Sequence, residues 1–205
     1  MLDFLFEHVD VVNAVLNALM VLIWTAYLHF FLINHLRQSR SVIHIDIGAA
    51  MGARSRCLVT NLSPNPIYVQ GIIADLVHNE NKVRTIVTER NEISEDDVEN
   101  PLARTNRGTL HPGHTVDIGS LSDLVSRARI SLGENWSADQ IDSVTITIVA
   151  IPGHSDRIVG ASKTFCAEEC EGYIKFTSQR ILTYQLRPRQ TRAQFSTILR
   201  DQTQA

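Results

Sequence analysis

The sequence predicts a mainly β protein in which a single N-terminal transmembrane α-helix precedes an antiparallel β-sandwich with one inserted amphipathic helix. Three observations lead to this class. Residues 11–36 form an apolar run without formal charge. From Ile43 onward, short segments alternate between apolar and polar residues, which is typical of half-buried strands. One segment, residues 121–132, has helical spacing instead.

The N-terminal run has the length of a membrane span. About 20 apolar residues at roughly 1.5 Å each cross a hydrocarbon core of about 30 Å. A cleaved signal peptide would start with basic residues and end at small ones, whereas this chain starts with acids and the run ends in His35, Leu36 and Arg37. A buried core helix is the other alternative. The hydropathy pattern favours the membrane span.

The charges that flank the run predict its orientation. None of the 19 Lys and Arg residues precedes Arg37, and Arg40, Arg54 and Arg56 follow soon after it. Positive residues stay on the cytoplasmic side, so we expect the N-terminus outside and the C-terminal body in the cytoplasm, in a bacterial inner membrane. The three cysteines agree, because a sparse and odd number is not the framework of a secreted disulfide-rich domain.

These patterns divide the chain into five predicted segments. They are a short extracytoplasmic N-terminus (1–10), the transmembrane helix (11–36), a juxtamembrane linker (37–41), the β-sandwich domain (42–190) and a basic C-terminal tail (191–205). The net charge of −3 comes from the three acids before the helix, and the remaining chain balances 19 basic residues against 22 − 3 = 19 acids. The neutral average therefore combines an apolar arm with a balanced body.

Two stripes on the helix predict association within the membrane. Residues of a helix turn by about 100° each, which places amides and a large aromatic on one stripe and small residues with an imidazole on another. Polar groups in lipid are costly without partners, and small residues let helices approach closely. At least one stripe is therefore expected to face another helix. The predicted association residues are Asn13, Ala14, Asn17, Ala18, Trp24 and His29.

The body contains seven or eight predicted strands separated by Pro- and Gly-containing turns. Residues 143–151 give the clearest run because β-branched side chains dominate it. The strand count and turn spacing favour an Ig-like sandwich, and an incomplete barrel is the alternative. The predicted runs are Ile43–Ile47, Cys57–Val59, Ile67–Leu76, Lys82–Thr88, Thr115–Ile118, Ser143–Ile151, Arg157–Cys166 and Tyr173–Leu186.

Two segments interrupt the strands. Residues 89–100 carry six acids and one arginine, which predicts a long solvated loop. Ser120 is then a helix N-cap with Asp123 three residues later, and apolar spacing continues to Leu132 before Gly133 ends the helix. A second, shorter turn is expected at Ser137 to Gln140, and a weak helix near Phe195.

Two histidines and two cysteines have a spacing that resembles a zinc site. His111 and His114 could supply imidazoles, and Cys166 and Cys170 could supply thiolates. The spacing matches no common zinc knuckle, and Pro112-Gly113 is typical of a turn. We therefore expect turn histidines and ordinary thiols, with no metal and no cofactor.

Catalytic motifs do not emerge from the sequence. His154, Ser155 and Asp156 are the residue types of a hydrolase triad, but the members of a triad converge from distant positions in a chain. The ten glycines form neither a dinucleotide-binding nor a nucleotide-phosphate loop. The prediction is a protein that binds rather than catalyses, and an enzyme whose site is assembled across loops is the alternative.

Arginines near the two ends of the body in the sequence predict contact with anionic lipid. Guanidinium groups pair well with phosphate, and the membrane anchor keeps the body near lipid rather than nucleic acid. No aromatic residues are interleaved for base stacking, so no nucleic-acid partner is expected. The predicted lipid contacts are Arg37, Arg40, Arg187, Arg189 and Arg192.

The function that these features predict is a single-pass membrane-anchored protein whose cytoplasmic sandwich is an interaction or scaffolding module. Its expected partners are lipid and either a second copy of the chain or a larger membrane complex, reached through the helix. The alternative is an oligomeric channel-like or membrane-permeabilising assembly controlled by the soluble domain. Only the Asn13 and Asn17 stripe supports that alternative.

Overall fold

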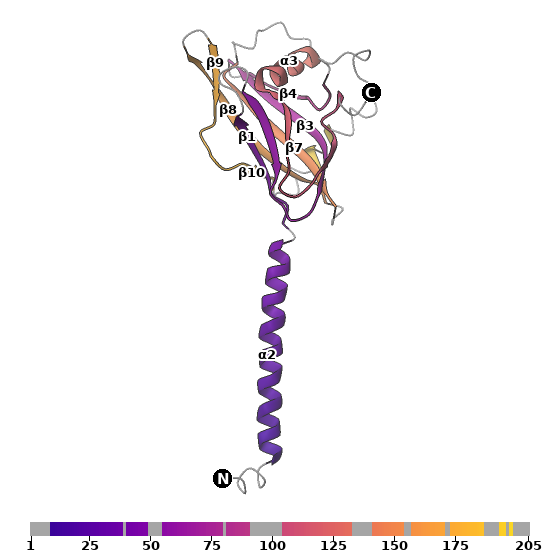
Figure 1. Cartoon of the computed structure of the whole chain (residues 1–205). Coiled ribbons are helices and arrows are strands. Elements are labelled where there is room, and N and C mark those ends of the chain that lie inside the picture. The colour runs from indigo at the N-terminus through magenta and orange to yellow at the C-terminus, as the bar shows by residue number, and fades with distance from the viewer. Residues whose placement is uncertain are drawn as a thin grey trace. The chain divides into compact units, whose positions relative to one another are not determined.

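The computed structural model contains one long helix and one β-rich domain (Figure 1). The chain divides into two compact units, residues 1–40 and 41–205, and each is described by itself. The structure describes residues 9–38, 40–48, 55–79, 81–90, 104–132, 141–153, 157–170, 173–186, 193–195 and 197–198.

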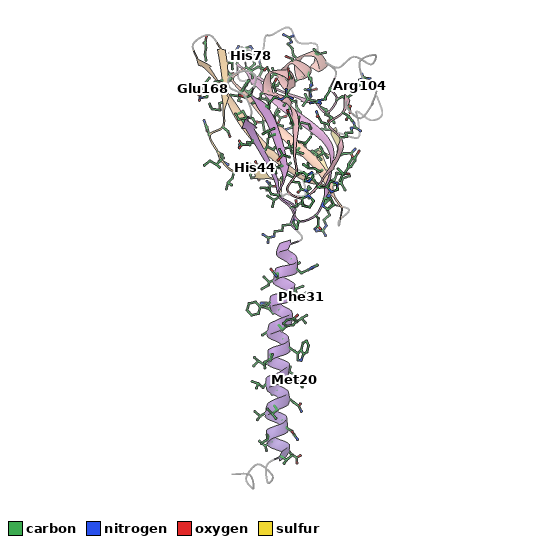
Figure 2. All side chains as sticks on the ribbon, viewed as in Figure 1. Met20, Phe31, His44, His78, Arg104 and Glu168 are labelled. Atoms are coloured by element: carbon green, nitrogen blue, oxygen red, sulfur yellow. The ribbon has the colours of Figure 1, made fainter. Side chains whose placement is uncertain are left out.

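Helix α2 spans Val9–Gln38 and is 30 residues long. It extends the predicted span by two residues at each end, because Val9, Asp10, Arg37 and Gln38 continue the same backbone helix past the uncharged run. Its apolar window is long enough to cross a membrane, and none of that window is buried. Side chains such as Met20 and Phe31 project outward from the helix without cover (Figure 2).

The second unit contains two antiparallel sheets. The smaller has the order β1-β2-β6 and the larger the order β10-β8-β7-β3-β4, with β5 paired to β3 and β9 paired to β8. The strands are β1 (Ile43–Gly48), β2 (Arg56–Asn61), β3 (Ile67–His78), β4 (Asn81–Ile86), β5 (Gly108–Leu110), β6 (Thr115–Ser120), β7 (Ser143–Pro152), β8 (Val159–Cys170), β9 (Tyr173–Thr177) and β10 (Tyr184–Gln185).

The two sheets share one hydrophobic core. Ile45 and Val59 enter it from the smaller sheet, and Ile72, Ile146 and Phe165 enter it from the larger one. Alternation explains why these residues face inward, because successive side chains of a strand point to opposite faces. Long β3 organises the larger sheet, since it pairs with β4, β5 and β7.

Helix α3 (Leu121–Leu132) is the predicted inserted helix and packs against β3, β4 and β6. Its N-terminus carries the predicted cap in reciprocal form. The Asp123 amide donates to Ser120 Oγ at 3.0 Å, and the Ser120 amide donates to Asp123 Oδ2 at 3.1 Å. The buried face contains Leu121, Leu124, Val125 and Ala128.

The outer face of the larger sheet carries a second, smaller apolar cluster. Phe195 and Leu186 pack there with Ile73 and Val149. Beside them the nearly buried Asp75 carboxylate accepts a hydrogen bond from Arg84 Nη2 at 2.8 Å, and the Arg84 guanidinium lies 5.1 Å from the centre of the Phe195 ring. The C-terminal segment around Phe195 therefore covers part of this face.

Apart from shifts of up to four residues at strand ends, the observed strands differ from the predicted ones in two places. The run predicted for 173–186 is divided into β9 and β10, because residues 178–183 leave the sheet. Strand β5 was not predicted, since three residues are too few to show an alternation. The turn expected at Ser137 to Gln140 lies outside the described residues.

Candidate functional site

The surface of α2 is the first candidate site, because all its predicted association residues are exposed on it. Asn13, Ala14, Asn17, Ala18, Trp24 and His29 each face outward from the single helix. Trp24 contacts Tyr27 edge to face at 6.0 Å, and Phe31 stacks on His35 at 6.2 Å. Thr25 satisfies its hydroxyl within the helix by donating to the Val21 carbonyl at 2.8 Å. None of the apolar window of α2 is buried by other described residues.

Two residues close in sequence to the predicted lipid-contacting arginines, Ile43 and Gln185, are joined by hydrogen bonds. Gln185 Nε2 donates to the Ile43 carbonyl at 2.7 Å, and the Ile43 amide donates to Gln185 Oε1 at 3.1 Å. Ile43 follows Arg40 by three residues, and Arg187 follows Gln185 by two. Arg40 is exposed, whereas the side chain of Arg37 and residues 187, 189 and 192 lie outside the described part.

A gap in the edge of the larger sheet forms the second candidate site. Strand β9 pairs with β8 as far as Thr177 opposite Cys166, and β10 resumes the pairing with Tyr184 opposite Ser162. Between them the chain departs as residues 178–183, which we call the edge loop. Within the described residues, positions 163–165 of β8 have no strand partner on this side.

Backbone polar groups of β8 point into this gap. The Leu186 amide donates to the Gly160 carbonyl at 2.8 Å, which shows that even-numbered residues of β8 direct their backbone groups toward β10. The N–H and C=O of Thr164 are therefore directed at the edge loop. The hydroxyl of Thr164 is hydrogen-bonded at 2.8 Å to that of Thr145, its neighbour on β7.

A pocket of about 410 Å³ lies between β8 and the edge loop, and we call it the edge pocket. Four of its nine lining residues carry hydroxyl groups, and the others include one guanidinium group, one carboxamide and one thiol. Such a lining donates hydrogen bonds and suits a polar or anionic ligand group. The lining residues are Ser162, Lys163, Thr164, Cys166, Ser178, Gln179, Arg180, Leu182 and Tyr184.

Lys163 binds the edge loop through its buried side chain. Its side chain is only 3% exposed, and its Nζ donates to Asp46 Oδ1 at 3.0 Å and to the Ile181 carbonyl at 3.3 Å. Partial burial alone would raise the pKa of Asp46, but the hydrogen bonds from Lys163 and from the Ile47 backbone, with the nearby positive charge, outweigh it. The pKa of Asp46 is therefore below its ordinary value of 3.8.

Side chains from the edge loop region also cover the open edge of β1. Thr183 Oγ1 accepts from the Ile45 amide at 2.9 Å and lies 3.2 Å from the Ile45 carbonyl. Gln185 makes the equivalent pair with Ile43. These two side chains occupy positions that a neighbouring strand would fill, which protects an edge that could otherwise recruit another chain.

The histidine and cysteine pairs lie at different ends of β3. His111 follows Leu110, which pairs with Ile67 at the start of β3. Cys166 pairs with Ser143 of β7, and Ser143 pairs with Val77 near the end of β3. Ten residues of strand separate these positions, or about 33 Å at 3.3 Å per residue. His111 and His114 form a pair of rings 5.7 Å apart, and no group of three metal-ligating side chains occurs among the described residues.

The remaining chemical candidates offer little reactivity. Burial raises the pKa of the Cys57 thiol to about 12, so this thiol is a core side chain rather than a nucleophile. Cys166 is a partly exposed free thiol on the pocket wall. The triad-like residues 154–156 and most of the acidic segment, residues 91–100, lie outside the described part of the chain.

Sequence reasoning missed the edge pocket altogether. Alternation in residues 173–186 indicated one strand, although Ser178, Gln179 and Arg180 form a polar interruption within it. That interruption is the only local signal of the loop. The pocket itself depends on where β8 lies, and strand pairing over such sequence distances has no local signature.

Comparisons with known proteins add little to this description. The sequence matches no known protein family, and no curated protein matches it. A crystal structure of a protein from Archaeoglobus fulgidus aligns with 63% of this chain and 98% of its own, at 14% identity and a TM-score of 0.20. A likeness at that level carries no argument about fold or function.

Proposed function

We propose that this is a single-pass membrane-anchored protein whose β domain is a protein-interaction or scaffolding module on the cytoplasmic side. One observation carries the proposal: the apolar window of α2 is long enough to span a bilayer, and no described residue buries any part of it. An apolar surface of this size in water would be strongly unfavourable. Insertion into a bilayer removes it from water.

The strand order supports an Ig-like sandwich for the module. Strands β1, β2 and β6 form one sheet, and β8, β7, β3 and β4 are consecutive neighbours in the other. This order matches the Greek-key arrangement in which strands A, B and E face G, F, C and C′. Helix α3 then occupies the connection between the E-like strand β6 and the F-like strand β7. Sandwiches of this class serve mainly in binding, although fold alone is an analogy for function.

Self-association through α2 is the proposed first interaction. The stripe of Ala14 and Ala18 permits close helix approach, and the Asn13 and Asn17 amides gain hydrogen bonds when they meet a partner in lipid. Contact of the flanking arginines with anionic lipid phosphates would stabilise the inserted state.

Co-purification of two differently tagged full-length copies from mildly solubilised membranes tests the association. Replacement of Ala18 by Ile should reduce recovery of the second copy, because the larger side chain separates the helices. Ala26→Ile is the matched control, since Ala26 lies about 80° further round the helix. Equal recovery of both variants would contradict association through the small-residue stripe.

Membrane insertion and orientation are tested by extraction and protease protection. The full chain should remain with the membrane in alkaline carbonate. Protease added outside intact cells with a permeabilised outer envelope should remove an N-terminal tag and leave a C-terminal tag intact. Release by carbonate would contradict the anchor, and loss of the C-terminal tag would contradict the cytoplasmic placement. A permeability increase that Asn17→Leu abolishes would favour the channel-like alternative instead.

A further inference from the structure

The tip of the edge loop presents two adjacent apolar side chains to the surroundings. Ile181 is 87% exposed and Leu182 is 79% exposed, more than any other large apolar side chain of the described residues. Tyr184, also exposed, follows two positions later. Isolated exposed apolar residues are common on proteins, but two at one loop tip beside a polar pocket form a distinct surface.

Hydrogen bonds connect the loop tip to the rest of the β domain. Lys163 bonds the Ile181 carbonyl from the core side, and Ser178 Oγ donates to the Arg180 carbonyl at 3.0 Å. Thr183 then fastens the end of the loop to Ile45 of β1. An ordered tip loses little conformational entropy when it meets a partner. The exposed apolar pair is thus prepared for contact.

The groups around the tip match the chemistry of a lipid interface. Aliphatic side chains enter the boundary of the acyl chains, tyrosine favours the headgroup level, and arginine and hydroxyl groups bind phosphate. Arg180 lines the edge pocket together with the hydroxyl-bearing Ser162 and Tyr184, whereas the hydroxyl of Ser178 already donates to the Arg180 carbonyl. The apolar tip and the phosphate-binding groups therefore adjoin each other.

Chain connectivity keeps this surface within reach of a bilayer. Strand β1 starts at Ile43, and α2 ends at Gln38. Five residue steps between them span no more than about 18 Å. The edge loop is hydrogen-bonded to β1 itself, at Ile45 and through Gln185 at Ile43.

We propose that the edge loop and edge pocket form a membrane-binding edge of the β domain, with Ile181 and Leu182 in the bilayer interface and a phospholipid headgroup phosphate beside Arg180. This inference rests on the membrane anchor of the proposed function. It adds a second contact with lipid, which fixes which edge of the β domain meets the bilayer.

Tryptophan fluorescence of the full chain in proteoliposomes tests the proposal. Leu182→Trp is introduced with Trp24→Phe, and the emission of the same chain with Leu182 retained is subtracted to remove the contribution of Trp136. In vesicles of phosphatidylcholine and phosphatidylglycerol, the emission of the introduced indole should shift to the blue. It should also lose most of its intensity when the lipids carry bromine on their acyl chains. Ile130→Trp on α3 is the matched control, because Ile130 is also exposed, and it should keep its emission.

The contrary outcomes are distinct. Red, unquenched emission from the Leu182→Trp chain would place the tip in water, and blue but unquenched emission would place it against protein, such as a second copy of this chain. Either result overturns the membrane-binding edge. Failure of the anchor is recognised separately, because the protein would then not sediment with the vesicles.

A second substitution in the Leu182→Trp chain tests the phosphate contact. Arg180→Gln should weaken the quenching by brominated lipid, because the loop tip loses its headgroup partner. Arg129→Gln on α3, which removes the same charge, should leave the quenching unchanged. Equal effects of the two substitutions would remove Arg180 from the site.

Discussion

Gly160 of β8 has no space for a side chain. A Cβ atom at this position would lie 2.8 Å from Leu186 Cδ1 and 2.9 Å from the Ile148 carbonyl oxygen, which is backbone and cannot rotate away. We predict that Gly160→Ala lowers the free energy of unfolding by about 1–3 kcal/mol through overpacking. Urea unfolding followed by circular dichroism in detergent measures this.

Gly48→Ala is the matched control for Gly160→Ala. The nearest atom to a Cβ at Gly48 is Leu58 Cδ1 at 3.7 Å, an ordinary contact distance. Its stability should stay close to that of the natural chain. Equal unfolding midpoints for the two variants would contradict the packing explanation.

Asp46 should make the stability of the β domain depend on pH in the acidic range. The pKa of Asp46 in the folded protein is below its ordinary value of 3.8, despite partial burial, because Lys163 and the Ile47 backbone favour the ionised form. A lowered pKa stabilises the folded state above the ordinary value, and that stabilisation disappears as pH falls through the folded-state pKa. The carboxylate is 57% exposed, so solvent weakens the effect.

The prediction is measured as the difference in unfolding free energy between the natural chain and Asp46→Asn. This difference should favour the natural chain near neutral pH and shrink when the pH is lowered from about 6 to about 3. A difference that is constant over this range would show that the carboxylate is not stabilised by Lys163. The sequence could not predict this pair, because 117 residues separate Asp46 from Lys163.

At the scale of elements, helix α3 is specified by its N-terminus. Ser120 and Asp123 exchange reciprocal hydrogen bonds between side chain and backbone. We predict that Ser120→Ala lowers the free energy of unfolding by about 1 kcal/mol, because one amide of the first turn loses its acceptor. Ser126→Ala, within the same helix, is the control and should not destabilise. Chemical unfolding of both variants measures this difference. An unchanged free energy of unfolding for Ser120→Ala would show that the cap is dispensable.

Local patterns predicted those elements whose residues carry their own signal. The cap and apolar spacing specified α3, and β-branched alternation specified β7. The edge loop was not predicted because Tyr173–Thr177 and Tyr184–Gln185 both have strand character. They are recognised as two strands only because they pair with separate parts of β8. Strand pairing depends on tertiary contacts, which a single sequence does not display.

At the scale of the molecule, charge and hydropathy predicted the division into an apolar arm and a β-rich body. The structure has the same division, because none of the apolar window of α2 is buried, whereas the two sheets enclose a core of their own. The order of strands in the sheets could not be predicted, since β3 lies next to β7 across more than sixty residues of chain. The edge pocket, which depends on that order, was equally inaccessible to sequence reasoning.

The separate core leads to a prediction about the isolated β domain. The buried apolar residues of the described structure all lie between Ile43 and Phe195, so residues 41–205 contain every core residue that the structure describes. We predict that residues 41–205 remain in solution without detergent and unfold cooperatively in urea, with a midpoint close to that of the β domain in the full chain. Phe165→Ala in the same fragment should cost about 3–5 kcal/mol, because Phe165 is fully buried in that core. A fragment that aggregates, or one whose stability does not respond to Phe165→Ala, would show that the β domain requires the helix or the membrane to fold.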